Sequence, residues 1–248
     1  SLTHLLEHKE LMEAFPTLKQ AAEVISTPQL RNQGTVGGNI CQRPRCWYYR
    51  GEFDCARKGG DICFAEEGEN QQHAILGGAG CYIVHPSDLA TALVALGARV
   101  EIAGPAGAKT VPMEKFFVLP EDDIENENIL KANEVLTKVM IPAIKDLKGA
   151  YVKVRIRESW DFALAAAAVA FTTAADGKVN NVRVVLGGVA PKPWRSPEAE
   201  AVIKGNKITD DLLMKAADAA LKDATPLELN APKVDMAKGA LIEAFNKA

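Results

Sequence analysis

The sequence predicts an α+β protein of two domains, in which antiparallel strands and helices occupy separate stretches of the chain. Two pairs of alternating segments flank short glycine-containing turns, which is typical of antiparallel hairpins. Apolar residues at helical spacing mark both ends of the chain. The segment 144–149 separates a first domain, residues 1–143, from a second domain, residues 148–248.

Composition places few limits on function. The chain has 248 residues, 48% hydrophobic and 25% charged, which is enough to bury one or two cores. A net charge of −3 gives no reason to expect nucleic acid or an anionic membrane as a partner. The longest apolar run, Phe162 to Phe171, is too short to span a bilayer. No secretion signal is visible, so we expect a cytoplasmic protein, with export to the periplasm together with a partner as the alternative.

The first domain opens with helices and a glycine-rich turn. Apolar spacing from Leu2 to Ile25, interrupted by Pro16, predicts two short helices, and Pro28 is expected to end the second. The turn Thr35-Val36-Gly37-Gly38-Asn39 follows. Paired glycines allow positive φ and lack Cβ atoms, so backbone N–H groups can approach a phosphate there. The pattern is neither a dinucleotide fingerprint nor a Walker loop, and an ordinary turn is the alternative.

All the cysteines lie in one loop, between the glycine turn and the middle of the first domain. They are Cys41, Cys46, Cys55, Cys63 and Cys81. The absence of CxxC excludes a zinc ribbon and a thioredoxin-type motif. The loop has few apolar residues, and thiolates on a metal centre would supply the missing stability, with nearby arginines and lysines offsetting their charge. The spacing leaves zinc and iron–sulfur open, and free buried cysteines are the simpler alternative.

The remaining elements alternate between strands and helices. In the first domain, strands are expected at 74–76 and 81–84, a helix capped by Ser87 or Asp88 at 89–96, and strands at 98–103, at 109–111 and before Pro142. In the second domain, strands are expected at 150–157, 162–174 and 179–189, followed by helices at 197–204, at 209–222 and at the C-terminus. The alanine-rich part of 162–174 has helical propensity, but the Asp176-Gly177 turn favours a strand.

Segments along most of the chain resemble one family. They are LRNQGTVGGNI, HPSDLATALVALGARVEIAGP, EVLTKVMIP and AYVKVRIRESWDFALAAAAVAF, in that order. They resemble the FAD-binding medium subunit of the molybdenum hydroxylases, the family of the carbon monoxide dehydrogenase flavoprotein and the flavin domain of xanthine dehydrogenase. The resemblance implies the C-terminal half of a vanillyl-alcohol-oxidase/PCMH-type FAD-binding domain, then a smaller domain with a three-stranded antiparallel sheet and a helical bundle. Nothing in Ser1 to Ser26 matches the first FAD loop of the family, so we expect a truncated chain or a separate chain that carries it.

The resemblance assigns FAD contacts to particular residues. It implies that Thr35, Val36, Gly37, Gly38 and Asn39 bind the cofactor. Asp88 would contact the adenosine part, although a helix cap needs no such role. Leu136 would lie against the isoalloxazine, with a plain core leucine as the alternative. Lys153 would reach the flavin or its phosphates, with an exposed lysine as the alternative.

The cysteine loop resembles an insertion in the 4-hydroxybenzoyl-CoA reductase β subunit and in the flavin subunit of periplasmic aldehyde oxidoreductase. In those relatives the insertion holds an extra [4Fe–4S] cluster. The positions that match its ligands here are Cys46, Cys55, Cys63 and Cys81, and Cys41 is left over as a buried neighbour.

The function that the resemblance implies is electron transfer. FAD and the [4Fe–4S] cluster on this chain would exchange electrons with [2Fe–2S] clusters on a small subunit and with an outside carrier such as ferredoxin. A large subunit with the molybdenum cofactor would oxidise the substrate, or reduce an aromatic thioester. No catalytic motif appears in the sequence, which fits chemistry that belongs to cofactors. The alternatives are a structural zinc-binding scaffold and a simple FAD reductase subunit without a cluster.

Overall fold

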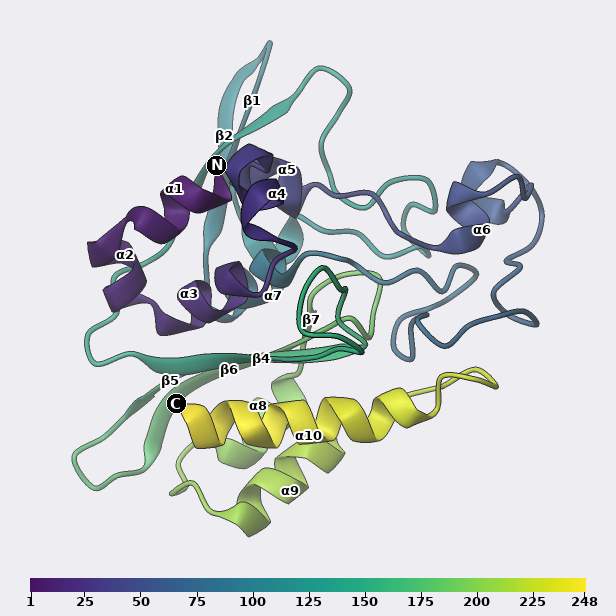
Figure 1. Ribbon diagram of the computed structural model, residues 1–248. Coiled ribbons are helices and arrows are strands. Elements are labelled where there is room, and N and C mark those ends of the chain that lie inside the picture. Colours follow the sequence, from purple (N-terminus) through teal and green to yellow (C-terminus); the bar gives the residue numbers. More distant parts are fainter.

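The computed structural model describes residues 1–248 and places an antiparallel sheet in the middle of the molecule, with helices on both faces (Figure 1). Its strands are β4 (Lys148–Val154), β5 (Ala165–Thr173), β6 (Val179–Gly187) and β7 (Trp194–Arg195), in that order across the sheet. Helices α3 (Pro16–Glu23) and α7 (Asp88–Ala95) cover one face. The other face is covered by α8 (Pro197–Ile203) and α10 (Pro232–Lys247), with α9 (Asp210–Ala220) packed against both.

The rest of the first domain surrounds α7. Short helices α1 (Leu2–Glu7), α2 (Lys9–Ala14), α4 (Pro28–Gln33) and α5 (Val36–Ile40) precede the cysteine loop, which contains α6 (Trp47–Arg50) and the 3₁₀ turn η1 (Ala56–Lys58). A second antiparallel sheet has the order β2 (Gly107–Pro112), β1 (Arg99–Gly104), β3 (Val135–Met140), and η2 (Met113–Lys115) follows β2. The cysteine loop projects to one side of the molecule, opposite α1 and α2 (Figure 1).

Strand β5 separates two hydrophobic cores. Successive strand residues point to opposite faces, so Ala166, Ala168 and Ala170 enter the core beneath α7, while Ala165, Ala167 and Val169 enter the core beneath α10. Both faces of β5 are buried. Its small side chains leave room for helices to pack closely on both sides of the sheet, which explains an alanine-rich strand despite alanine's helical propensity.

The α+β class with antiparallel sheets is confirmed. The second-domain sheet has β7 in addition to the three predicted strands. Pro28 begins α4 rather than ending the preceding helix, a position where the missing N–H costs nothing. The glycine turn is in fact α5, with Thr35 as its N-cap. No helix combines the length and apolar character that a membrane span requires.

Two predicted strands and the predicted end of a third are also wrong. Segments 74–76 and 81–84 form no ladder; positive φ angles at Gly77 and Gly80 curve the chain, and the amides of Ile75 and Leu76 both donate to the carbonyl of Val189. Strand β4 ends at Val154 instead of Arg157, because the Asp161 carboxylate accepts from the backbone amides of the next residues, Ile156 and Arg157.

Candidate functional site

Four of the five cysteines line one cavity in the projecting loop. Cys46, Cys55, Cys63 and Cys81 surround a space of about 290 Å³. Cys55 and Cys81 are buried, and the other two are half-buried. No group of three or more His, Cys, Asp or Glu side chains converges closely enough to hold a single metal ion. The thiols are therefore spread over the wall of a cavity rather than focused on one point.

Cys41 lies outside this cavity. It is the C-cap of α5, it packs against the core beneath α7, and burial raises its thiol pKa to about 11.

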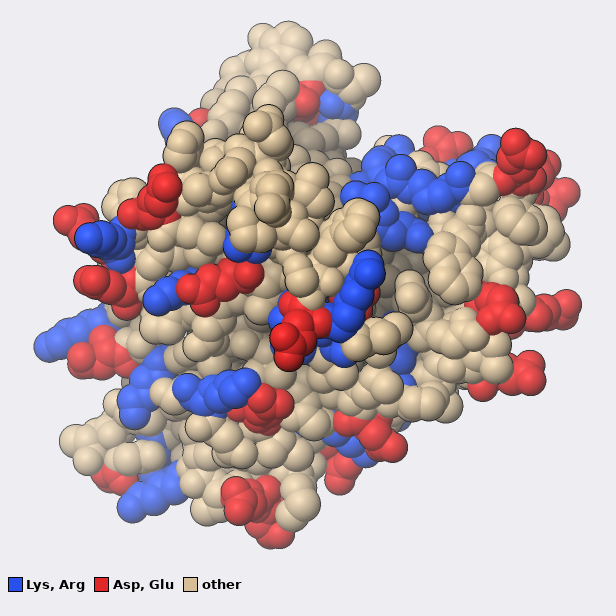
Figure 2. All heavy atoms as spheres, viewed as in Figure 1, with Lys and Arg blue, Asp and Glu red and all other residues tan.

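Arg57 is the basic side chain that reaches the cysteine cavity. Its guanidinium is 1% exposed; it donates to the carbonyl of Ile124 and forms an ion pair with the buried carboxylate of Glu127. Burial raises the pKa of the Cys81 thiol, and the adjacent Arg57 acts in the opposite direction. The other basic residues of the loop point elsewhere: Arg45 stacks over the ring of Phe162, and Lys58 donates to the carbonyl of Gly51. Figure 2 shows lysine and arginine side chains gathered between α5 and the cysteine loop, with acidic side chains at the outer rim.

Aromatic rings form part of the wall of the cavity and pack behind it. Tyr48 packs edge-on against Phe53 at a ring-centre distance of 5.0 Å and parallel to Phe64 at 6.2 Å. These rings keep water away from the thiols and supply the apolar contacts that the loop otherwise lacks.

His73 stands beside Cys46. The distance from His73 Nε2 to Cys46 Sγ is 3.2 Å, and His73 Nδ1 is buried without a partner. Burial, together with the nearby Lys233 ammonium, lowers the pKa of His73 to about 4, so its ring is neutral near pH 7. Sequence reasoning missed this residue, because a single histidine in a polar loop carries no motif.

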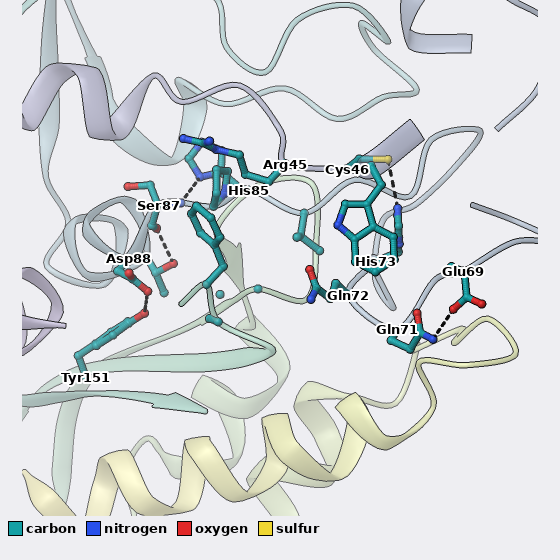
Figure 3. A pocket seen from close by; sticks show the side chains of 18 residues that line it. Arg45, Cys46, Glu69, Gln71, Gln72, His73, His85, Ser87, Asp88 and Tyr151 are labelled. Carbon is teal, nitrogen blue, oxygen red and sulfur yellow. Dashed lines mark hydrogen bonds between the residues drawn. The ribbon is translucent and has the colours of Figure 1, made fainter. Parts of the chain in front are cut away.

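A second pocket of about 680 Å³ adjoins the cysteine cavity, and both are lined by Cys46 and His73. At its far end lie Asp88 and Tyr151 (Figure 3). We call it the Asp88 pocket.

Asp88 and Lys153 form a buried ion pair. Lys153 Nζ lies 2.8 Å from Asp88 Oδ2, with side-chain exposures of 2% and 8%, and the Tyr151 hydroxyl donates to Asp88 Oδ1 over 2.5 Å. Burial raises the pKa of Asp88, and Lys153 opposes that shift. The N-cap of α7 is Ser87, whose hydroxyl accepts from the amide of Ala90, so the Asp88 carboxylate is not the cap. Lys153 is buried rather than exposed.

The remaining predicted cofactor residues lie in two places. Thr35, Gly38, Asn39 and Asp88 line a hollow of about 1220 Å³ on one side of α5. Val36, Gly37 and Leu136 line a separate, mostly apolar hollow of about 870 Å³. Asn39 is tied to the start of α7, because its Oδ1 accepts from the Ser87 hydroxyl over 2.6 Å.

Comparison with known proteins identifies relatives along the whole chain. Residues 1–144 match the model of the FAD binding domain in molybdopterin dehydrogenase, and residues 150–236 match the CO dehydrogenase flavoprotein C-terminal domain. The aldehyde oxidoreductase FAD-binding subunit PaoB of Escherichia coli is 34% identical over 92% of this chain and 71% of its own length. The carbon monoxide dehydrogenase medium chain of Hydrogenophaga pseudoflava is 28% identical over 86% of this chain and 58% of its own length.

Solved structures agree with these matches. The Hydrogenophaga pseudoflava carbon monoxide dehydrogenase that lacks the Mo-pyranopterin moiety of the molybdenum cofactor superposes with a TM-score of 0.73 and 27% identity. That superposition covers 99% of this chain and 71% of the other. This chain therefore spans about three fifths to seven tenths of the length of these relatives.

Proposed function

Since this chain belongs to the family of FAD-binding medium subunits of the molybdenum hydroxylases, we propose that it is an electron-transfer subunit that holds a [4Fe–4S] cluster beside its FAD. The observation that carries the proposal is the set of four cysteines that line one cavity.

The FAD site of the proposal combines the α5 segment with the start of α7. Thr35, Gly38, Asn39 and Asp88 line one hollow, which is consistent with one end of an extended cofactor there. Val36, Gly37 and Leu136 would contact it from the other side of α5, and Lys153 would act through Asp88, whose carboxylate it holds. FAD supplies one- and two-electron chemistry; the residues of this chain would bind it and fix its position.

The cluster site of the proposal is the cysteine cavity, with Cys46, Cys55, Cys63 and Cys81 as ligands. Four thiols around a cavity suit a polynuclear cluster, whereas zinc needs four ligands about 2.3 Å from one point. Arg57, paired with Glu127, would stabilise the Cys81 thiolate, and the aromatic wall would exclude water. The cluster supplies one-electron chemistry.

The partners of the proposal follow from the family. The relatives include medium chains of carbon monoxide dehydrogenase and of glyceraldehyde dehydrogenase. By analogy, a large subunit would carry the molybdenum cofactor and a small subunit the [2Fe–2S] clusters. A soluble carrier such as ferredoxin would exchange electrons with the [4Fe–4S] cluster.

A matched pair of cysteine variants tests the cluster. Cys55→Ser removes a proposed ligand, whereas Cys41→Ser removes a cysteine that lies outside the cavity. We expect iron and the broad visible absorption of the cluster to be lost from the complex with Cys55→Ser and retained with Cys41→Ser. If both variants keep the iron and flavin of the parent complex, the chain is an FAD reductase subunit without a cluster.

A further inference from the structure

Among the four cysteines of the cavity, Cys46 is the one that also lines the Asp88 pocket. His73 is the other residue that belongs to both linings. Figure 3 shows the two side chains joined at one end of that pocket, with Asp88 and Tyr151 at the other end. Together they form the partition between the two spaces.

We propose that His73 is a positioning residue of the cluster, which holds the ligand Cys46 by donating Nε2–H to its sulfur. This inference rests on the proposed function. No bond to Cys46 or His73 forms or breaks.

The chemistry of the pair fixes the direction of the hydrogen bond. A ligating thiolate only accepts, so the proton of the His73 ring lies on Nε2, 3.2 Å from Cys46 Sγ. Nδ1 is buried without a partner. A buried unpaired polar atom costs stability, so the ring is held toward the sulfur at the expense of its other nitrogen.

The backbone around His73 is held from several sides. Its amide donates to the carbonyl of Asn70 over 2.9 Å. Its carbonyl accepts from Lys233 Nζ over 2.8 Å and from Asn230 Nδ2 over 3.2 Å. Both of these donors belong to the second domain, at and just before the start of α10. The second domain therefore fixes the position of the ring that contacts Cys46.

A hydrogen bond to a ligand sulfur has a defined electronic effect. It stabilises the more negative, reduced form of a cluster and raises its reduction potential. Loss of the donor should therefore make the cluster harder to reduce and should loosen Cys46.

The test compares His73→Leu and His73→Gln in the complete complex, with His4→Leu on the exposed face of α1 as the control. Leucine cannot donate a hydrogen bond, whereas the amide of glutamine can. The readouts are iron per complex, the midpoint potential of the cluster from a titration followed by electron paramagnetic resonance, and the rate of cluster reduction after rapid mixing with substrate.

We expect His73→Leu to retain iron, to shift the potential to more negative values and to slow cluster reduction about 10-fold or more. His73→Gln should recover most of both effects, and His4→Leu should match the parent. An unchanged potential and rate in His73→Leu would overturn the inference. Loss of iron from both His73 variants would also overturn the inference, because the hydrogen-bond donor of glutamine would then not replace the histidine ring. Absence of iron from the parent complex would instead overturn the proposed function.

Discussion

The buried pair of Asp88 and Lys153 gives the sharpest test of the site's energetics. In Asp88→Asn, Lys153 loses its counter-charge, although its side chain is only 2% exposed and its Nζ retains the carbonyl of Val24 at 3.4 Å. Leaving one member of a buried pair without its partner costs about 3–5 kcal/mol. The double variant that combines Asp88→Asn with Lys153→Met should recover most of the lost unfolding free energy, because neither charge remains to be buried.

The pair also predicts a pH dependence. In Lys153→Met, the Asp88 carboxyl keeps the Tyr151 hydroxyl but loses its counter-charge, and burial raises its pKa above the unfolded value. The folded state then binds a proton more tightly than the unfolded state. Stability is therefore greatest below the unfolded pKa, about 3.9, and falls as pH rises through the folded pKa. The variant should lose more stability at pH 8 than at pH 5.

Urea unfolding at both pH values, followed by circular dichroism, measures these effects. Lys19→Met is the control, because the Lys19–Glu23 pair is about half exposed and spans 4.0 Å. It should change stability by less than about 0.5 kcal/mol. Additive losses in the Asp88 and Lys153 double variant, with a coupling energy near zero, would refute the reasoning.

Two further predictions concern packing and the link between domains. Gly149→Ala in β4 would place a Cβ 2.4 Å from the Val169 carbonyl oxygen and should lower the melting temperature. In Gly239→Ala, within α10, the added Cβ meets nothing within 4 Å. That variant should raise the melting temperature, with a gain in stability of about 0.5–1 kcal/mol. Lys233→Met should cost about 1–3 kcal/mol, because Lys233 Nζ donates to three backbone carbonyls. Burial lowers the pKa of Lys233 from 10.5 to about 7, so the unfolded state binds more protons between those values. The stability of the parent should therefore rise with pH over that range, and the stability of the Lys233 variant should lack this rise. Urea titrations at several pH values measure the difference.

Local sequence signals predicted the second domain better than the first. The Asp176-Gly177 turn located the β5–β6 hairpin, since Gly177 has a positive φ of 81° that glycine adopts without strain. The end of β4 was not predictable in this way, because it depends on the carboxylate of Asp161 binding backbone amides several residues away.

The site shows the same division between local and long-range signals. The family resemblance predicted a common centre for Cys46, Cys55, Cys63 and Cys81, and the structure places all four around one cavity. The role of His73 depends on contacts with Cys46, 27 residues away, and with Lys233, 160 residues away. Such contacts form only when the second domain packs against the loop, and no local pattern encodes them.

The most direct test of the cluster is anaerobic iron, sulfide and zinc analysis of the purified complex and of this chain alone, combined with electron paramagnetic resonance after reduction. We predict about four irons per copy of this chain, beyond those of the proposed [2Fe–2S] clusters, with a reduced [4Fe–4S] signal that disappears in Cys55→Ser. Zinc without iron on this chain, and no such signal in the reduced complex, would contradict this prediction.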